Sequence, residues 1–135
     1  LRNSEKAWEP PKNNAYFSYD DKHLYVDFDT VFPPKTNILK GHSANDPESG
    51  VWGVESFELH LRHSGKMYYF AGCVNGGKTE SLKNVANFNP AWDYKSHIGM
   101  QIDDTFLWEG KVAIPWTAIG LNAPPKELKM NFKTK

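Results

Sequence analysis

Short runs in which apolar and polar residues alternate constrain the fold of this chain more than any other feature. In one run Leu24, Val26 and Phe28 alternate with polar residues, which predicts a strand over 23–29 with these three side chains inward. Six further runs are expected to form strands, at 14–19, 54–62, 67–75, 97–102, 106–114 and 128–132. Seven short strands without a long helical pattern predict an all-β fold. We expect an antiparallel, jelly-roll-like β-sandwich with one short helical turn after Pro115.

The length and composition of the chain limit the number of domains and the kinds of molecule that it can bind. The chain has 135 residues, enough for one modest core, so we expect a single domain over 1–135 that could belong to a larger protein. Its 16 basic and 16 acidic residues are interspersed and give zero net charge, which argues against nucleic acid as a partner. No apolar run reaches the roughly 20 residues of a membrane helix, so no membrane insertion is expected. Cys73 is the one cysteine, which excludes an internal disulfide and leaves the redox compartment open.

A tryptophan ahead of a strand with a carboxylate on one face gives the first indication of function. Trp52 stands six residues before Glu58. If the apolar residues of 54–62 face a core, Glu58 and His60 face outward. An indole packs well on the C–H surface of a sugar ring, and a carboxylate accepts hydrogen bonds from sugar hydroxyls. These residues predict a carbohydrate site.

Four segments resemble the motifs of one known family, in the same order. Residues 20–26 (DDKHLYV) resemble the opening motif D-D-x-x-L-Y-V, and residues 52–61 (WGVESFELHL) resemble W-x-x-D-S-V-E-I-F-L. Residues 108–115 (WEGKVAIP) resemble W-x-x-E-x-A-I-P, and residues 128–132 (LKMNF) resemble the closing W-x-F-N-F. The four motifs extend over most of the chain. On them, the chain resembles the family 9 carbohydrate-binding modules and the related DOMON-like β-sandwiches.

The resemblance implies binding roles by position. The family stacks the ends of sugar chains between two aromatic side chains and fixes the hydroxyls with Glu, Arg and Asn. The family's Arg position holds Cys73 here, and its second stacking Trp would lie beyond Lys135. Trp92 could substitute for that second plate. The expected ligand-binding residues are Trp52, Glu58 and Asn75, followed by Tyr69, His60 and Trp92.

The resemblance also implies a function without chemistry, namely binding of an oligo- or polysaccharide. Such modules usually tether a catalytic domain to a polysaccharide or belong to larger secreted bacterial proteins. An extracellular, cell-surface or periplasmic location is therefore expected. No cofactor is expected with certainty, although the resemblance allows a structural calcium ion without locating it. Asp20–Asp21 and Asp103–Asp104 are interpreted as turn residues that could still ligate calcium.

Other interpretations stay open. Some DOMON-like domains carry haem for electron transfer, and the candidate ligands here are Met67, Met100, Met130, His60, His63 and His97. A further alternative is a purely structural sandwich without a ligand. Residues 72–79 match the phosphate-loop pattern G-x-x-x-x-G-K-[ST], but the lack of βα units favours a glycine-rich hairpin end. Glu55 and Glu58 are three residues apart and oppose each other on a strand, which argues against paired catalytic carboxylates.

Overall fold

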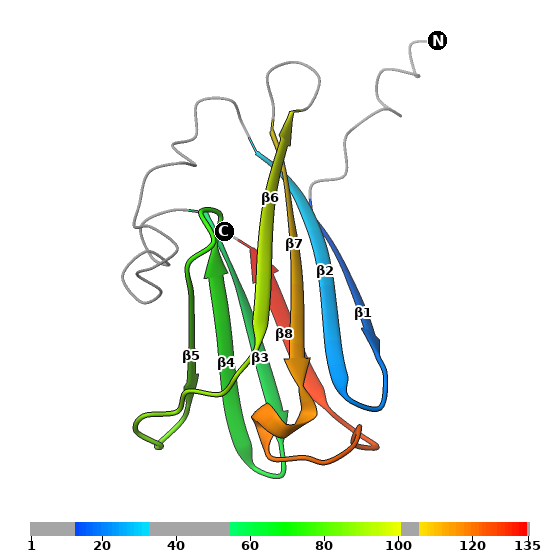
Figure 1. The fold of residues 1–135 in the computed structure, drawn as a ribbon, viewed down its shortest axis with the longest axis vertical. Coiled ribbons are helices and arrows are strands. Elements are labelled where there is room, and N and C mark those ends of the chain that lie inside the picture. Colours follow the sequence, from blue (N-terminus) through cyan, green and yellow to red (C-terminus); the bar gives the residue numbers. More distant parts are fainter. Residues whose placement is uncertain (1–12, 33–54, 101–105, 135) are drawn as a thin grey trace.

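The computed structural model describes residues 13–32, 55–100 and 106–134, which form two antiparallel four-stranded sheets packed face to face (Figure 1). The first sheet has the order β1-β2-β7-β6, and the second has the order β5-β4-β3-β8. The strands are β1 Asn13–Tyr19, β2 His23–Phe32, β3 Ser56–His63, β4 Lys66–Cys73, β5 Lys78–Leu82, β6 Asp93–Met100, β7 Phe106–Pro115 and β8 Lys129–Thr134. The predicted all-β sandwich is confirmed. No helix of the described residues is long and apolar enough to cross a membrane.

All seven predicted strands are present, and the sequence pattern missed one more. The eighth strand, β5, lies in a segment where no clear alternation predicts a strand. Its register places Lys78 opposite Gly72 and Glu80 opposite Phe70, so two charged residues share the inward face of this strand. The segment 72–79 is the antiparallel turn from β4 to β5, which confirms a glycine-rich hairpin end. A phosphate loop would instead lead into a helix.

The core is built around the ring of Phe28 on β2. Its ring centroid lies 5.1 Å from that of Trp108, 5.2 Å from that of Phe57 and 5.2 Å from that of Phe132. Phe28 therefore contacts β7 within its own sheet and β3 and β8 across the sandwich. Gly110 stands directly opposite Phe28 on β7, and a Cβ atom at Gly110 would overlap the Phe28 ring. The absence of a side chain at Gly110 is what leaves room for this ring.

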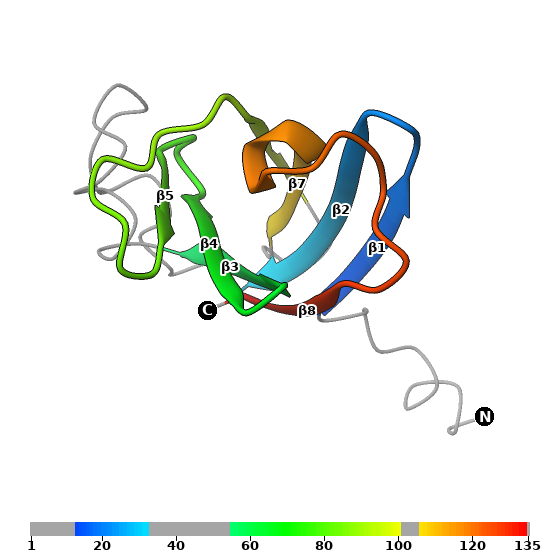
Figure 2. The same ribbon diagram turned by 90° about the horizontal axis from the view of Figure 1, so that it is seen from below.

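A single turn of 3-10 helix, η2 (Trp116–Ile119), closes one end of the sandwich, as predicted for the segment after Pro115. Gly120 ends this turn with a left-handed φ of 78°, which glycine adopts without a steric cost. The Tyr68 hydroxyl donates a hydrogen bond of 3.0 Å to the Ile119 carbonyl and so ties β4 to η2. Figure 2 looks onto this end and shows the orange turn between the two sheets.

Substitution of Gly110 should measure how tightly Phe28 is packed. We expect Gly110→Ala to lower the free energy of unfolding by about 1–3 kcal/mol, since the added methyl group displaces the Phe28 ring. Urea denaturation followed by fluorescence measures the change. Gly99→Ala on β6 is the matched control, because the nearest atom to its new Cβ, His97 Nε2, would lie 3.9 Å away. Equal losses in both variants would contradict this account of the core.

Candidate functional site

The candidate site lies on the outer face of the second sheet. On β3, Leu59 and the apolar residues two positions to either side of it are buried in the core. Side chains alternate along a strand, so Glu58, His60 and Arg62 lie on the opposite, outer face, as the sequence predicts. The outer face of β3, one of the two central strands of the second sheet, therefore carries polar side chains.

Pairing with β4 and β8 arranges these side chains in three rows across the sheet. Glu58 lies between Ala71 and Lys133, His60 between Tyr69 and Asn131, and Arg62 between Met67 and Lys129. Successive rows are two positions apart along each strand, which corresponds to about 7 Å. We call the surface formed by these nine residues the β3/β8 face. It includes a depression of about 470 Å³ that is lined by His60, Arg62, Met67, Lys129, Asn131 and Lys133, among others.

Glu58 is on the predicted face, but it is not open to solvent. The residue is 5% exposed. One of its carboxylate oxygens lies 3.5 Å from His60 Nε2 and 3.5 Å from Lys133 Nζ. A carboxylate is buried at acceptable cost only when cations or hydrogen-bond donors surround it. The expectation of a solvent-facing carboxylate is therefore wrong, and Glu58 instead positions the more exposed His60 and Lys133.

His60 and Tyr69 form an aromatic pair beside this carboxylate. Their ring centroids are 5.0 Å apart, and the His60 side chain is 39% exposed. The pKa of Tyr69 is raised, first by burial of the phenol and then by the charge of Glu58 and a hydrogen bond to it. Tyr69 therefore keeps its proton well into the alkaline range. The structure thus brings together three of the predicted site residues, Glu58, His60 and Tyr69.

Two further polar residues of this face, Asn131 and Lys133, were absent from the sequence prediction. Both belong to β8, where Phe132 packs into the core beside Phe57. The alternation of Met130 and Phe132 predicts a strand, and the same alternation places Asn131 and Lys133 on the outer face. The signal was therefore present in the sequence. An amide offers both donors and acceptors to a ligand, and an ammonium group offers three donors.

Asn75 lies away from this group. It follows the end of β4 and lies in the turn to β5, beyond the row that contains Ala71 and Glu58. Its side-chain oxygen accepts hydrogen bonds from the Gly77 backbone amide at 3.1 Å and from the Cys73 thiol at 2.5 Å. Asn75 therefore holds the turn between β4 and β5. Burial raises the pKa of the Cys73 thiol, so this residue stays a neutral thiol in the strand.

Trp92 is a core residue, which overturns its expected role as an exposed stacking plate. It is 3% exposed, and its ring packs edge-on against Phe70 with the centroids 5.1 Å apart. The indole Nε1 donates a hydrogen bond of 2.7 Å to Glu80. The Lys78 ammonium lies 4.9 Å from the centroid of the ring and donates to the Trp92 carbonyl. These contacts also explain how β5 places two charged side chains toward the core.

The remaining candidate residues are dispersed. Trp52, the predicted stacking plate, lies outside the described residues, as do Asp103 and Asp104. Asp20 is a turn residue as predicted, because its side chain accepts hydrogen bonds from the backbone amides of Lys22 and His23 at 2.8 and 2.7 Å. Among the described residues, no group of three or more His, Cys, Asp or Glu side chains could hold a metal ion.

The proposed haem ligands do not form one cluster. His60 and Met67 share the β3/β8 face, and the Met67 sulfur accepts a hydrogen bond of 3.4 Å from the Arg62 guanidinium. His97 lies on the first sheet, opposite Glu109 on β7. Met130 is the register partner of Leu61 on the edge strand β8, and it is exposed. His60 thus lies near two of the candidate methionines, Met67 and Met130, in the depression of the β3/β8 face.

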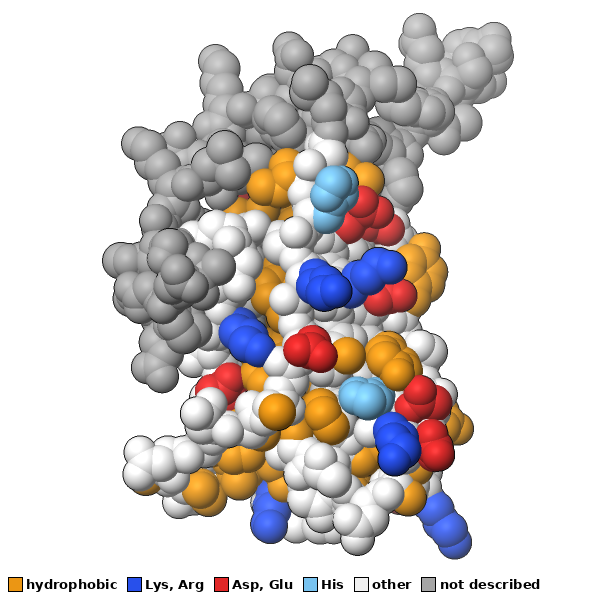
Figure 3. Space-filling view, in the orientation of Figure 1, with side chains coloured by type: hydrophobic (Ala, Val, Ile, Leu, Met, Phe, Trp, Pro, Cys, Tyr) orange, Lys and Arg blue, Asp and Glu red, His pale blue; other side chains and the backbone are white. Residues whose placement is uncertain are grey.

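The outer face of the first sheet is also polar, but its charges are balanced. Figure 3 shows Lys, His and acidic side chains side by side over β6, β7 and β2. Lys111 on β7 stands between Asp27 and Lys95, and in the next row Glu109 stands between Asp29 and His97. These residues line a depression of about 550 Å³. Each of these rows contains at least one acid and one basic residue, in contrast to the row of Arg62 and Lys129 on the β3/β8 face.

Comparison of the chain with protein-family models, with curated proteins and with solved structures gave no match. The resemblance to the family 9 carbohydrate-binding modules therefore stays a prediction that rests on the four sequence motifs.

Substitution of Trp92 distinguishes a buried core residue from an exposed stacking residue. We expect Trp92→Ala to lower the free energy of unfolding by about 3–5 kcal/mol, because it removes a large buried ring. Trp92→Phe keeps most of the apolar volume and removes the hydrogen bond to Glu80, so its effect should be smaller. Urea denaturation of both variants measures the two losses of unfolding free energy, and the loss should be larger for Trp92→Ala. A stable Trp92→Ala variant would contradict the buried position of the ring.

Ionisation of Tyr69 should make stability depend on pH in the alkaline range. Its folded-state pKa is raised above the unfolded value of about 10, so its contribution to stability is complete below pH 10 and is lost as the pH rises further. We expect Tyr69→Phe to reduce the decline of the unfolding free energy above pH 10, by at most about 1.4 kcal/mol per pH unit. Tyr16→Phe, at an exposed tyrosine, is the control. An identical pH profile for wild type and Tyr69→Phe would argue against a buried phenol.

Proposed function

We propose that this protein binds carbohydrate on the β3/β8 face and catalyses no reaction there. The proposal rests on one observation above all. An aromatic pair, His60 and Tyr69, lies beside hydrogen-bonding groups that a buried carboxylate, Glu58, holds in place. Rings provide a surface for the C–H groups of a sugar, and fixed polar groups select its hydroxyls.

In this proposal the polar side chains have distinct tasks. Asn131 and Lys133 donate hydrogen bonds to hydroxyls, and the Asn131 carbonyl also accepts them. Glu58 binds the sugar indirectly, by fixing His60 and Lys133. A side chain that is already held in position loses less conformational entropy when a ligand arrives. The open shape of the depression fits weak binding, because water competes for each hydroxyl.

The carboxylate content of this face supports binding rather than hydrolysis. Glycoside hydrolases generally use two carboxyl groups about 5 to 9.5 Å apart, one on each side of the scissile bond. Of the nine residues that define the β3/β8 face, Glu58 is the carboxylate, and it is engaged by His60 and Lys133. A carboxylate in this setting suits a structural role.

The sequence resemblance extends the proposal beyond the described residues. It assigns Trp52 as the stacking plate and allows a structural calcium ion. It further suggests an extracellular or periplasmic protein of bacterial type, in which this domain directs a linked catalytic domain to a polysaccharide. These parts of the proposal rest on the four motifs alone.

Removal of ring or amide groups from the β3/β8 face should weaken sugar binding. We expect His60→Ala and Asn131→Ala each to raise the dissociation constant about 10-fold, which corresponds to the loss of one contact of about 1.4 kcal/mol. Affinity electrophoresis in gels that contain neutral or acidic polysaccharides identifies a ligand, and calorimetry with its oligosaccharides gives the constants. Trp52→Ala tests the stacking role that the resemblance assigns.

The matched control is His97→Ala, which removes an exposed histidine from the outer face of the first sheet. It should leave retention unchanged. If no polysaccharide retards the wild-type protein, the proposed function is wrong. If His97→Ala weakens binding as much as His60→Ala does, the site lies elsewhere on the molecule.

A further inference from the structure

The third row of the β3/β8 face places two cations directly opposite each other. Arg62 on β3 and Lys129 on β8 are register partners, and both are exposed. Like charges in this position repel each other and destabilise a sheet. Within the described part of the chain neither side chain forms an ion pair, and the side-chain partner of Arg62 is the sulfur of Met67. Lys126 and Glu127 line an adjoining hollow with both cations and carry opposite charges, so the surroundings of this row keep a net positive charge.

The same arrangement on the other sheet has acidic residues as register neighbours. Lys95 and Lys111 are also register partners, on β6 and β7. However, Asp27 stands on the other side of Lys111, and Glu109 and Asp29 lie in the adjacent row. The row adjacent to Arg62 and Lys129 contains Tyr69, His60 and Asn131 instead. These two rows of the β3/β8 face thus contain two positive charges and no acidic residue, at one end of the proposed sugar site.

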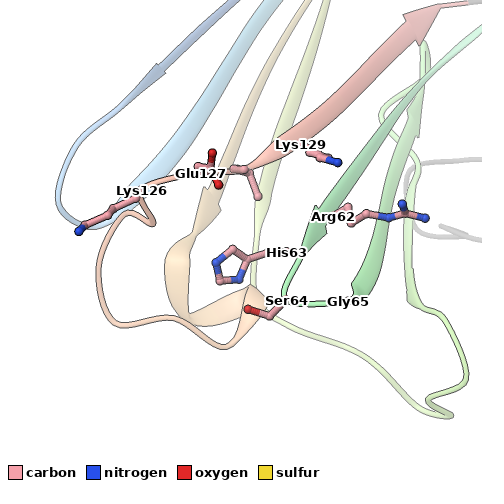
Figure 4. Close-up of a pocket in the computed structure, with 8 residues that line it drawn as sticks. Arg62, His63, Ser64, Gly65, Lys126, Glu127 and Lys129 are labelled. Carbon is pink, nitrogen blue, oxygen red and sulfur yellow. The ribbon is translucent and has the colours of Figure 1, made fainter.

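The two cations are also placed where a ligand can reach them. Both line the depression beside His60 and Asn131, and both line an adjoining hollow of about 450 Å³. Figure 4 shows their side chains extending to the same side of β3 and β8, whereas the Lys126 side chain points away from them. The row that holds them is about 7 Å from the row of His60.

We propose that Arg62 and Lys129 bind an anionic group of the carbohydrate, so that the preferred ligand is an acidic polysaccharide. This inference rests on the proposed function. The anionic group is a carboxylate of a uronic acid or a sulfate ester, since a guanidinium binds either through two parallel hydrogen bonds and an ammonium adds a point charge. The sugar ring lies on His60 and Tyr69, and its charged group, or that of the next residue, meets the cations. Binding of the anion also relieves the repulsion between them.

Polysaccharides that differ in charge alone provide the test. The probes are polygalacturonate and its fully methyl-esterified form, glucuronoxylan and its carboxyl-reduced form, and dextran sulfate and dextran. We expect wild type to bind an acidic member at least 10-fold more tightly than its neutral counterpart at low salt, and this ratio to fall as salt is added. In Arg62→Gln/Lys129→Gln the ratio should fall toward one. Arg62→Lys/Lys129→Arg should retain most of it. The uronate and sulfate pairs distinguish the two sources of the anion.

The matched control is Lys95→Gln/Lys111→Gln, which changes the net charge equally on the other sheet. It should leave the acidic preference intact. Equal affinity for both members of every pair would overturn this inference and leave the proposed function in place. An acidic preference that survives in Arg62→Gln/Lys129→Gln, or that both double variants lose equally, would also overturn it. Failure to bind any of the six polysaccharides would instead overturn the proposed function itself.

Discussion

The Phe28 ring at the centre of the sandwich is the contact on which the other features depend. Phe28 meets Phe57 on β3 and Phe132 on β8, and these contacts fix which side of each strand faces inward. Because side chains alternate with a period of two, a slip of one residue would turn the outer face of a strand into its inner face. The packing of three aromatic rings thereby determines that Glu58 and Asn131 face outward. Gly110 is part of the same constraint, since its missing side chain allows the ring to enter.

The outer face of β3 combines buried and exposed polar groups in a way that stiffens it. Glu58 is buried and contacts His60 and the Lys133 ammonium, both of which are more exposed than the carboxylate. A surface whose polar side chains are already oriented suits recognition of sugar hydroxyls. The pair of Arg62 and Lys129 then adds a preference for charge at one end of the same surface.

Much of this fold could be predicted from local alternation, and the limits of that prediction have physical causes. The patterns of β2, β3 and β7 are clear because one face of each strand packs into the core. On β5 the pattern fails, since Lys78 and Glu80 point inward and are held there by Trp92, a residue distant in sequence. Alternation also gave the correct face for Glu58, but it could not give the extent of burial, which depends on neighbouring strands. The position of Trp92 in the core was beyond local reasoning for the same reason.

The position of β8 at the edge of the second sheet has a consequence for association between molecules. An edge strand exposes unpaired backbone groups, and natural sheets often protect such edges with lysine. If two copies of β8 paired symmetrically about Asn131, Lys129 of each copy would face Lys133 of the other. Repulsion between these ammonium groups opposes the joining of two sheets into one continuous sheet. The alternating lysines of β8 thus help to keep neighbouring molecules apart at high concentration.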